Sequence, residues 1–210
     1  MKINYKVISG IALLLIIPIQ LFSQNIEQKK ELNYMLNYLL ETKYALYKSI
    51  EGISLEEWNY TPADGGWTIG EIAEHVLEAE KTIYNKLSNN FFVEENKVVS
   101  GGDSEETDKQ ILKLTTDRSR KLNAPEAIQP KGRWENPEDF LIYFEGIRNR
   151  TIDFVKNASG DFRLYAVYFP PLDKNMDGYD WLLIIPSHTT RHLAQIQENK
   201  DEYANGVTND

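Results

Sequence analysis

Apolar side chains recur at intervals of three and four residues along four long stretches of this 210-residue chain. That spacing places them on one face of an α-helix, and we find no clear run of the strict alternation that is typical of a half-buried strand. The four stretches cover residues 26–50, 68–87, 137–159 and 179–203. No internal repeat is present. The sequence therefore predicts an all-α fold, a four-helix bundle in which each helix buries its apolar stripe against the others.

Several helix ends are marked by residues that satisfy exposed backbone groups. Residues 68–71, Thr-Ile-Gly-Glu, have the form of a capping box at the start of the second long helix, and Asn136-Pro137 is typical of the start of the third. A further capping box over residues 54–57 predicts a single helical turn. Pro186 falls inside the last predicted helix, where it either kinks the helix or marks a later start.

Residues 89–134 show no sustained helical spacing. Glycine and serine at residues 100–104 predict a surface loop, and one short helix is expected around Ile111. Two prolines and a glycine favour an extended chain after residue 124. The connection between the second and third long helices is therefore expected to be a long irregular crossover.

The N-terminal residues 1–23 have the pattern of a secretory signal peptide. Two lysines precede an almost wholly apolar run over residues 7–22, and Ser23 is a small residue at which a signal peptidase can cut. An uncleaved membrane anchor is the alternative, but this run is interrupted by a proline and is short for a span of about 20 residues. We expect an exported protein, periplasmic or secreted, with no stable membrane insertion after cleavage. The mature chain then divides into a bundle domain, 24–205, and a short tail, 206–210.

The charge balance and the cysteine content exclude several classes of function. Lysine and arginine number 23 against 32 aspartates and glutamates, a formal net charge of -9 at pH 7. Proteins that bind nucleic acid usually carry a basic face, so no nucleic-acid partner is expected. The chain has no cysteine, which excludes disulfides, thiolate nucleophiles, cysteine zinc sites and iron–sulfur clusters. The candidate chemistry therefore depends on three histidines.

The three histidines fall on inward faces of two predicted helices. His188 and His192 are four residues apart on the last helix, hence one turn apart on one face. His75 lies mid-way along the helix over residues 68–87, on the stripe that carries Ile72 and Val76. If the two helices are neighbours, the imidazoles can converge and hold a divalent metal, with positions left for water or substrate. The alternative is a satisfied buried His75 and a separate polar patch, and the residues alone leave both open.

Other conspicuous residues receive structural interpretations. Glu71 and Glu78 share the helical angle of His75, so either can serve as a general base or as a hydrogen-bond partner of His75. We favour Glu71 as the capping-box carboxylate and Glu78 as a solvated charge. Arg191 can orient an anionic substrate, although a surface ion pair is favoured. Residues 173–178 begin like a calcium loop but lack the closing acid, so they are interpreted as a turn. Four tryptophans are expected to pack in the core or under loops: Trp58, Trp67, Trp134 and Trp181.

Two motifs resemble the DinB-like helical bundle superfamily. Residues 58–80, WNYTPADGGWTIGEIAEHVLEAE, have the superfamily's loop with a proline, tryptophan before a helix and histidine in mid-helix. Residues 188–197, HTTRHLAQIQ, resemble its closing signature, and residues 117–134 are similar less specifically. The similarity covers about residues 26–203. The resemblance implies an up-down-down-up bundle with a divalent metal, zinc or nickel, on three histidines, which correspond here to His75, His188 and His192.

These observations favour a metal-dependent hydrolase that acts on a small-molecule substrate. A three-histidine site leaves room for water, whose pKa a bound metal lowers toward about 7. A non-catalytic bundle that binds a metal or another ligand is the alternative, and a purely structural helical domain is the third. The enzyme requires a water-accessible cavity beside the histidines, whereas the structural domain requires none. A homodimer is left open by the sequence.

Overall fold

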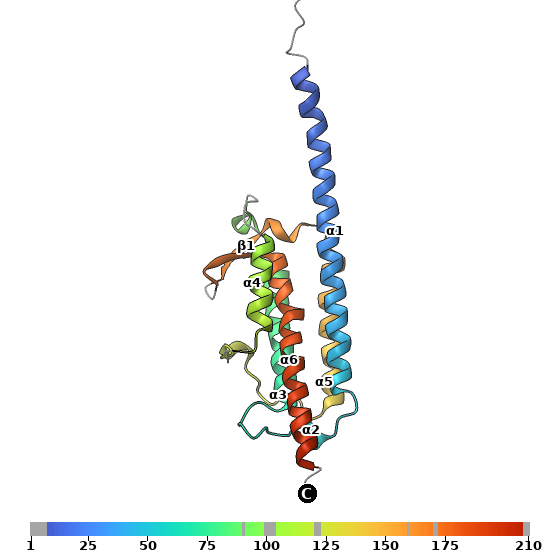
Figure 1. Ribbon diagram of the computed structural model, residues 1–210, viewed down its shortest axis with the longest axis vertical. Coiled ribbons are helices and arrows are strands. Elements are labelled where there is room, and N and C mark those ends of the chain that lie inside the picture. The colour runs from blue at the N-terminus through green and yellow to red at the C-terminus, as the bar shows by residue number, and fades with distance from the viewer. Residues whose placement is uncertain are drawn as a thin grey trace, which may run out of the picture.

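The computed structural model describes residues 8–89, 91–98, 104–119, 123–158, 160–169 and 172–207, with only the backbone described before residue 26. Four long helices pack side by side (Figure 1): α1 (Ile8–Ile50), α3 (Ile69–Asn89), α5 (Pro137–Lys156) and α6 (Gly178–Val207). These are the four helices expected from the apolar spacing, and the prediction of a mainly helical bundle is confirmed.

The predicted signal peptide falls partly on the first turns of α1, which begins well before the expected first helix. Its two lysines, Lys2 and Lys6, and the last three residues of the predicted tail lie outside the described residues. Among the described residues, no helix has the length and apolarity needed to span a membrane. The signal peptide and the domain limits remain predictions.

Contacts between residues distant in sequence give the relative directions of α1 and α6. The hydroxyls of Tyr38 and Thr190 are 3.0 Å apart, and Lys200 Nζ donates to the Ser49 carbonyl at 2.9 Å. Residue numbers therefore rise together along both helices, so α1 and α6 run parallel.

The other two long helices, α3 and α5, are also parallel to each other. Glu80 pairs with Arg148, and the rings of Tyr84 and Phe154 lie 5.7 Å apart, so residue numbers again rise together. Asn199 Nδ2 donates to the Trp67 carbonyl near the start of α3, which makes α3 antiparallel to α6. The bundle is therefore up-down-down-up, as the resemblance implied.

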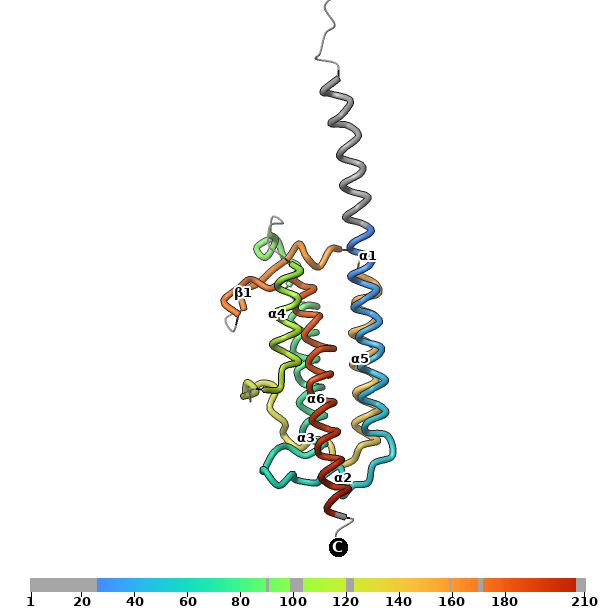
Figure 2. Tube along the Cα trace, viewed as in Figure 1, coloured from blue at the N-terminus to red at the C-terminus, as the bar shows by residue number. Residues whose placement is uncertain are grey.

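A parallel pair of consecutive long helices requires the chain to return along the bundle, and the crossover after α3 makes this return. It contains α4 (Ser104–Thr116), which packs along α6, and three residues of 3₁₀-helix, η2 (Glu126–Ile128), which contact α3. A second 3₁₀ turn, η1 (Glu94–Asn96), precedes α4. Figure 2 follows this segment from the end of α4 past α3 into α5. The expected short helix around Ile111 is α4.

The prediction of an all-α chain is wrong in one place. After a 3₁₀ turn, η3 (Phe162–Leu164), strand β1 (Ala166–Phe169) pairs antiparallel with β2 (Lys174–Asp177), where we expected no strand and only a turn over residues 173–178. Val167 and Phe169 pack against the core cluster that contains the fully buried Met176. Four-residue strands beside prolines are too short to display a clear alternation in sequence. Pro170 and Pro171 lie outside the described residues.

Most predicted helix starts are confirmed. The Ser54 side chain caps α2 (Leu55–Trp58) by accepting from Glu57 N, and Asn136 caps α5 by accepting from Asp139 N at 2.8 Å. Helix α6 begins at Gly178 and continues through Pro186, so the alternative of a later start is wrong.

The core consists of two apolar clusters, with a buried polar group between them on every long helix. One cluster includes Leu46, Ile72, Phe144 and Ile196, and the other includes Met35, Ile83, Val155 and Leu183. Between them, Arg148 pairs with Glu80 and donates to Thr42 and Thr189. This ion pair is almost completely buried, and its hydrogen bonds join all four helices.

Candidate metal centre

The structure brings the three predicted histidines together between α3 and α6. Nε2 of His188 lies 3.2 Å from Nε2 of His75 and 3.1 Å from Nε2 of His192. The ring centroids are 4.4 to 4.9 Å apart, and the ring planes are inclined by 66° to 77° to one another. The antiparallel packing of α3 on α6 thus places one edge of each imidazole at a shared point.

Hydrogen bonds on the outer nitrogens define the tautomers of two rings. His75 Nδ1 lies 2.7 Å from the carbonyl oxygen of Ile128, and His192 Nδ1 lies 2.9 Å from Oε1 of Gln195. Carbonyl oxygens only accept hydrogen bonds, so each Nδ1 carries the proton and donates it. In the neutral imidazole the other nitrogen is then unprotonated, and both Nε2 atoms direct lone pairs toward the centre.

Burial keeps the three imidazoles uncharged. His75 and His192 are 4% and 7% exposed, and burial lowers the pKa of His75. Burial and the nearby His75 ring lower the pKa of His192 to about 3. For His188, burial followed by the two neighbouring histidines lowers the pKa well below its usual value. Three neutral bases therefore face one another near pH 7.

This arrangement fits a divalent cation. Metal–nitrogen bonds of about 2.0–2.1 Å require ligand nitrogens about 2.9–3.4 Å apart at octahedral or tetrahedral angles, and the two Nε2 separations around His188 fall in that range. The three ligand atoms all lie within 4.8 Å of one another. Within the described ranges, no other group of three histidine, aspartate or glutamate side chains has this spacing.

Comparison with known proteins assigns the family. The family model of the DinB superfamily matches residues 38–196, about three quarters of the chain. The chain belongs to the DinB superfamily.

Two relatives of this DinB-superfamily chain come from Bacillus subtilis. The uncharacterized protein YuaE of strain 168 is 22% identical over 163 residues, which cover 77% of this chain and 94% of YuaE. The solved structure of YfiT, described as a probable metal-dependent hydrolase with an unusual four-helix bundle topology, matches with a TM-score of 0.54. That match is 15% identical and covers 84% of this chain and 89% of YfiT. At this identity the likeness to YfiT shows the fold alone.

Aromatic and basic side chains surround the histidines of this DinB-superfamily chain. The Trp67 ring lies 4.8 Å from the His75 ring, and the Trp67 carbonyl is held by Asn199. Arg118 pairs with Glu198, and Arg191 donates to a backbone carbonyl, that of Asp117, at the end of α4. The guanidinium groups therefore lie where α4 meets α6.

Of the two glutamates singled out from the sequence, one behaves as expected. Glu71 Oε2 accepts from the Thr68 amide at 2.9 Å and Thr68 Oγ1 accepts from the Glu71 amide, so the capping box is confirmed. The interpretation of Glu78 as a solvated charge is wrong, because its side chain is 12% exposed and pairs with Lys81 and Arg133.

Sequence reasoning missed a third glutamate on α3, directly before His75. Glu74 is 1% exposed and accepts from the backbone amides of Lys131 and Arg133, each at 3.1 Å, and from Arg133 Nε at 2.7 Å. Burial alone would raise the pKa of Glu74, but these hydrogen bonds outweigh it and lower the pKa. No pattern in the sequence connects Glu74 to a loop that begins more than 50 residues later.

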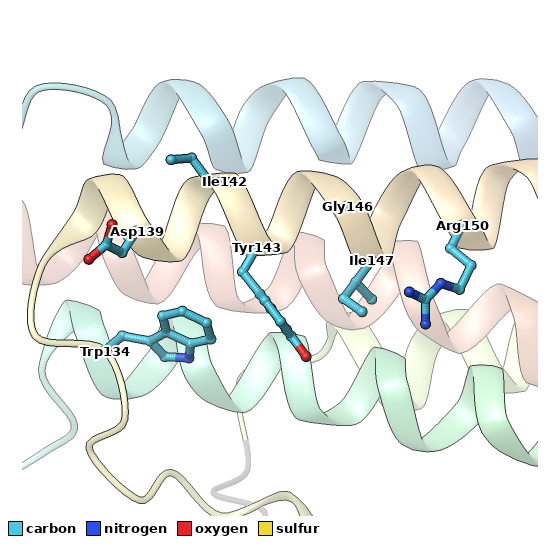
Figure 3. Close-up of a pocket in the computed structure, with 7 residues that line it drawn as sticks. All are labelled: Trp134, Asp139, Ile142, Tyr143, Gly146, Ile147 and Arg150. Carbon is cyan, nitrogen blue, oxygen red and sulfur yellow. The ribbon is translucent and has the colours of Figure 1, made fainter.

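Two surface depressions lie along α5, away from the histidines. One has a volume of about 360 Å³ and is lined by Trp134, Tyr143 and Arg150 among others, and the next, about 540 Å³, extends toward Asn157. Figure 3 shows Tyr143 and Ile147 projecting from α5 toward α3. Neither depression includes a histidine, so they do not form the cavity that the enzyme hypothesis requires.

A second cluster of titratable groups lies near the start of α6. Arg163 pairs with Asp108, Glu31 and Asp177 at 2.7, 2.8 and 3.1 Å, and Asp180 lies 3.5 Å from it. Asp177 and Asp180 also cap α6, since each side chain accepts from the other's amide. Burial, followed by the charge of Asp177, raises the pKa of Asp180 to about 8. Of the residues that resembled the start of a calcium loop, Asp177 belongs to this carboxylate cluster, whereas Asp173 accepts a hydrogen bond from the Tyr168 hydroxyl.

Proposed function

We propose that this DinB-superfamily chain is a metal-dependent hydrolase that holds one divalent cation on His75, His188 and His192. One observation carries the proposal: three neutral imidazoles direct their Nε2 atoms at one another with separations of 3.1 and 3.2 Å around His188. The unprotonated Nε2 atoms of His75 and His192 both face His188 Nε2, and a cation bound by all three nitrogens would use their lone pairs. Imidazole ligands suit zinc and nickel, and these are the ions we expect.

The residues around the histidines prepare the ligands before any cation binds. The Ile128 carbonyl and the Gln195 side chain fix the tautomers of His75 and His192, which leaves their Nε2 atoms unprotonated. The low pKa values prevent protonation from competing at neutral pH. A divalent cation bound by three protein ligands supplies Lewis acidity and lowers the pKa of water toward about 7, which is the chemistry of a hydrolase.

One comparison supports the reaction class. The chain belongs to the same structural type as YfiT, and that protein is described as a probable metal-dependent hydrolase. The glutamates closest to His75 along α3 are engaged elsewhere, with Glu71 in the cap and Glu74 on the crossover. We therefore assign no general base, and the substrate we propose is a small molecule of unspecified class.

Metal analysis of the full chain, purified without an affinity tag, tests the proposal. We expect about one zinc or nickel ion per chain in the parent protein, and none in a His188→Ala variant, because two ligands hold a divalent ion much less tightly than three. If His188→Ala stays folded and binds no metal, the metal site of the parent includes His188. A parent protein that binds no divalent metal overturns the proposal.

A panel of ester, amide and phosphoester substrates then separates an enzyme from a binding protein. Turnover by the metal-loaded parent, absent in His188→Ala, supports the hydrolase. Metal binding with no turnover of any substrate supports the alternative, a non-catalytic bundle that binds a metal or another ligand.

The proposal includes export. The lysines, the apolar run and Ser23 at the N-terminus support cleavage of a signal peptide. N-terminal sequencing of the protein from its native host should find a chain that begins near Gln24. A cytosolic chain that retains Met1 would contradict export.

A further inference from the structure

We infer that Glu74 is the positioning residue of the histidine site: it anchors the crossover loop so that the Ile128 carbonyl holds the His75 ring. This inference rests on the proposed function, because it concerns the same metal ligands. Glu74 is a buried carboxylate whose hydrogen bonds go to the crossover loop and not to any of the three imidazoles.

The first step is that the Glu74 carboxylate fixes the crossover loop through hydrogen bonds. Oε2 accepts from the amides of Lys131 and Arg133 at 3.1 Å each, and Oε1 accepts from Arg133 Nε at 2.7 Å. Two amides that flank one residue converge on a single oxygen because Gly132 between them has a φ of 67°. Such a turn forms a concave anion cradle of backbone N–H groups. Glu74 fills that cradle, and at 1% exposure water has little access to replace it.

The second step connects the cradle to the histidine. Only Gln129 and the stiff Pro130 separate Lys131 from Ile128, whose carbonyl accepts from His75 Nδ1 at 2.7 Å. The short 3₁₀ turn η2 fixes the other side of Ile128 through a hydrogen bond from its amide to Pro125. Helix α3 therefore holds the same loop at two consecutive residues, by the carboxylate of Glu74 and by the ring of His75.

The third step is the effect on the ligand. With the Ile128 carbonyl in place, His75 keeps its proton on Nδ1 and turns an unprotonated Nε2 toward His188. If the loop moves away, the ring can rotate and can place its proton on Nε2, and that nitrogen then cannot bind a cation. Partners that orient a metal-binding histidine contribute about 10–100-fold to metal affinity in other proteins.

Glu78 provides a matched control on the same helix. It is a glutamate one turn further along α3, mostly buried, and it pairs with the same Arg133 side chain at 3.3 Å. In the part of the chain that the structure describes, the polar partners of Glu78 are the Lys81 and Arg133 side chains, and no backbone amide of the loop donates to it. Glu78→Gln therefore removes an equivalent charge next to Arg133 and leaves the anchored amides with Glu74.

The experiment measures zinc affinity of the full chain by competition with a chromogenic chelator. Glu74→Leu should lower the affinity about 10–100-fold, and Glu78→Gln should stay close to the parent. Glu74→Gln keeps an oxygen for the two amides but places an NH₂ group against Arg133. Its zinc affinity should therefore lie between those of Glu74→Leu and Glu78→Gln. Affinity in folded Glu74→Leu equal to the parent's, or an equal loss in Glu78→Gln, overturns the inference. If Glu74→Leu does not fold, the two glutamine variants decide: equal affinities overturn it.

A second measurement is independent of metal. The chain has three histidines, so the ¹⁵N resonances of its imidazoles can be assigned in the metal-free protein. His75 should be an Nδ1–H tautomer in the parent and in Glu78→Gln, and a mixture of tautomers in Glu74→Leu. An unchanged His75 tautomer in folded Glu74→Leu overturns the role of Glu74. A parent that binds no divalent metal, neither zinc nor nickel, refutes the proposed function, while the tautomers still test Glu74.

Discussion

The histidine cluster and the carboxylate cluster around Arg163 both concentrate titratable side chains, but only one of them contains a cation of its own. In the first, three bases with lowered pKa values stay neutral and face one another. In the second, four acids surround a guanidinium that makes ion pairs of 2.7 to 3.1 Å with three of them. The carboxylate cluster is thus complete within the chain, and the histidine cluster lacks a positive partner.

This difference shows why acidic residues are a poor guide to metal sites. The carboxylate cluster looks more like a cation site by composition, yet the Arg163 guanidinium uses the oxygen lone pairs that a metal needs. The acids also fail the spacing that three ligands to one ion require, which only the histidines meet among the described residues. The Arg148–Glu80 pair in the core behaves like the carboxylate cluster, with its partners inside the protein. A buried polar cluster is therefore a candidate metal site when its positive partner is absent from the protein, as in the histidine cluster.

Removal of the internal cation should have the largest effect. Arg163→Met leaves Glu31, Asp108 and Asp177 close together and mostly buried, so the free energy of unfolding should fall by about 3 kcal/mol in urea titrations. The control is Lys43→Met, which removes a cation paired with the half-exposed Glu145 and should change stability by at most about 1 kcal/mol. Equal losses in the two variants would mean that Arg163 is only a surface charge.

Supplying the missing cation should stabilise the histidine cluster by a similar amount. Zinc at a free concentration of 100 times its Kd should raise the free energy of unfolding of the parent by about 2.7 kcal/mol, because it binds only the folded chain tightly. His188→Ala should gain almost nothing at the same zinc concentration, whereas Gln197→Ala, an exposed change on the same helix, should respond like the parent. A gain in His188→Ala equal to the parent's would place the zinc elsewhere.

Acid should weaken the metal-free histidine cluster. The pKa of His192 is about 3 in the folded chain and about 6.5 when unfolded. As the pH falls below the pKa of His192 in the unfolded chain, the unfolded chain binds a proton at this residue and the folded chain does not. The free energy of unfolding therefore decreases. Between pH 6.5 and pH 5 the parent should lose about 2 kcal/mol relative to His192→Gln, whose side chain does not titrate. With a chelator present, a constant difference between the two urea midpoints over this range would disprove the low pKa.

Much of the bundle could be predicted from the sequence because its determinants are local. Spacing of apolar residues and caps such as Asn136 depend on neighbours within one or two turns, and they located the four long helices. The convergence of His75 with His188 could be anticipated because inward faces of adjacent helices must meet. The family resemblance supplied the choice between a metal site and an isolated buried histidine.

The features that were missed depend on contacts between distant segments. Glu74 accepts a hydrogen bond from an amide 57 residues away, and no periodicity in the sequence predicts that contact. Glu78 was expected in solvent because its helical angle gave no sign of the crossover chain that covers it. The hairpin after Phe162 consists of strands stabilised by packing on the core cluster around Met176 rather than by their own pattern. Tertiary contacts override local preference in each of these places.

The smallest effect should appear at alkaline pH, in the carboxylate cluster, with a sign opposite to that of the histidines. The pKa of Asp180 is raised to about 8, above its unfolded value of about 3.8. Between those values the folded chain retains a proton that the unfolded chain has released, so stability falls as pH rises and is lost once Asp180 ionises. From pH 7 to pH 8 the parent should lose about 1 kcal/mol relative to Asp180→Asn, which keeps an oxygen for the Asp177 amide but cannot ionise. The histidines and Asp180 change the free energy of unfolding in opposite directions as the pH rises, so the pH profile of the parent alone can look flat. The difference between the parent and each variant separates the two clusters. A difference that does not change between pH 7 and pH 8 would mean that Asp180 is already ionised at pH 7 and that burial does not raise its pKa.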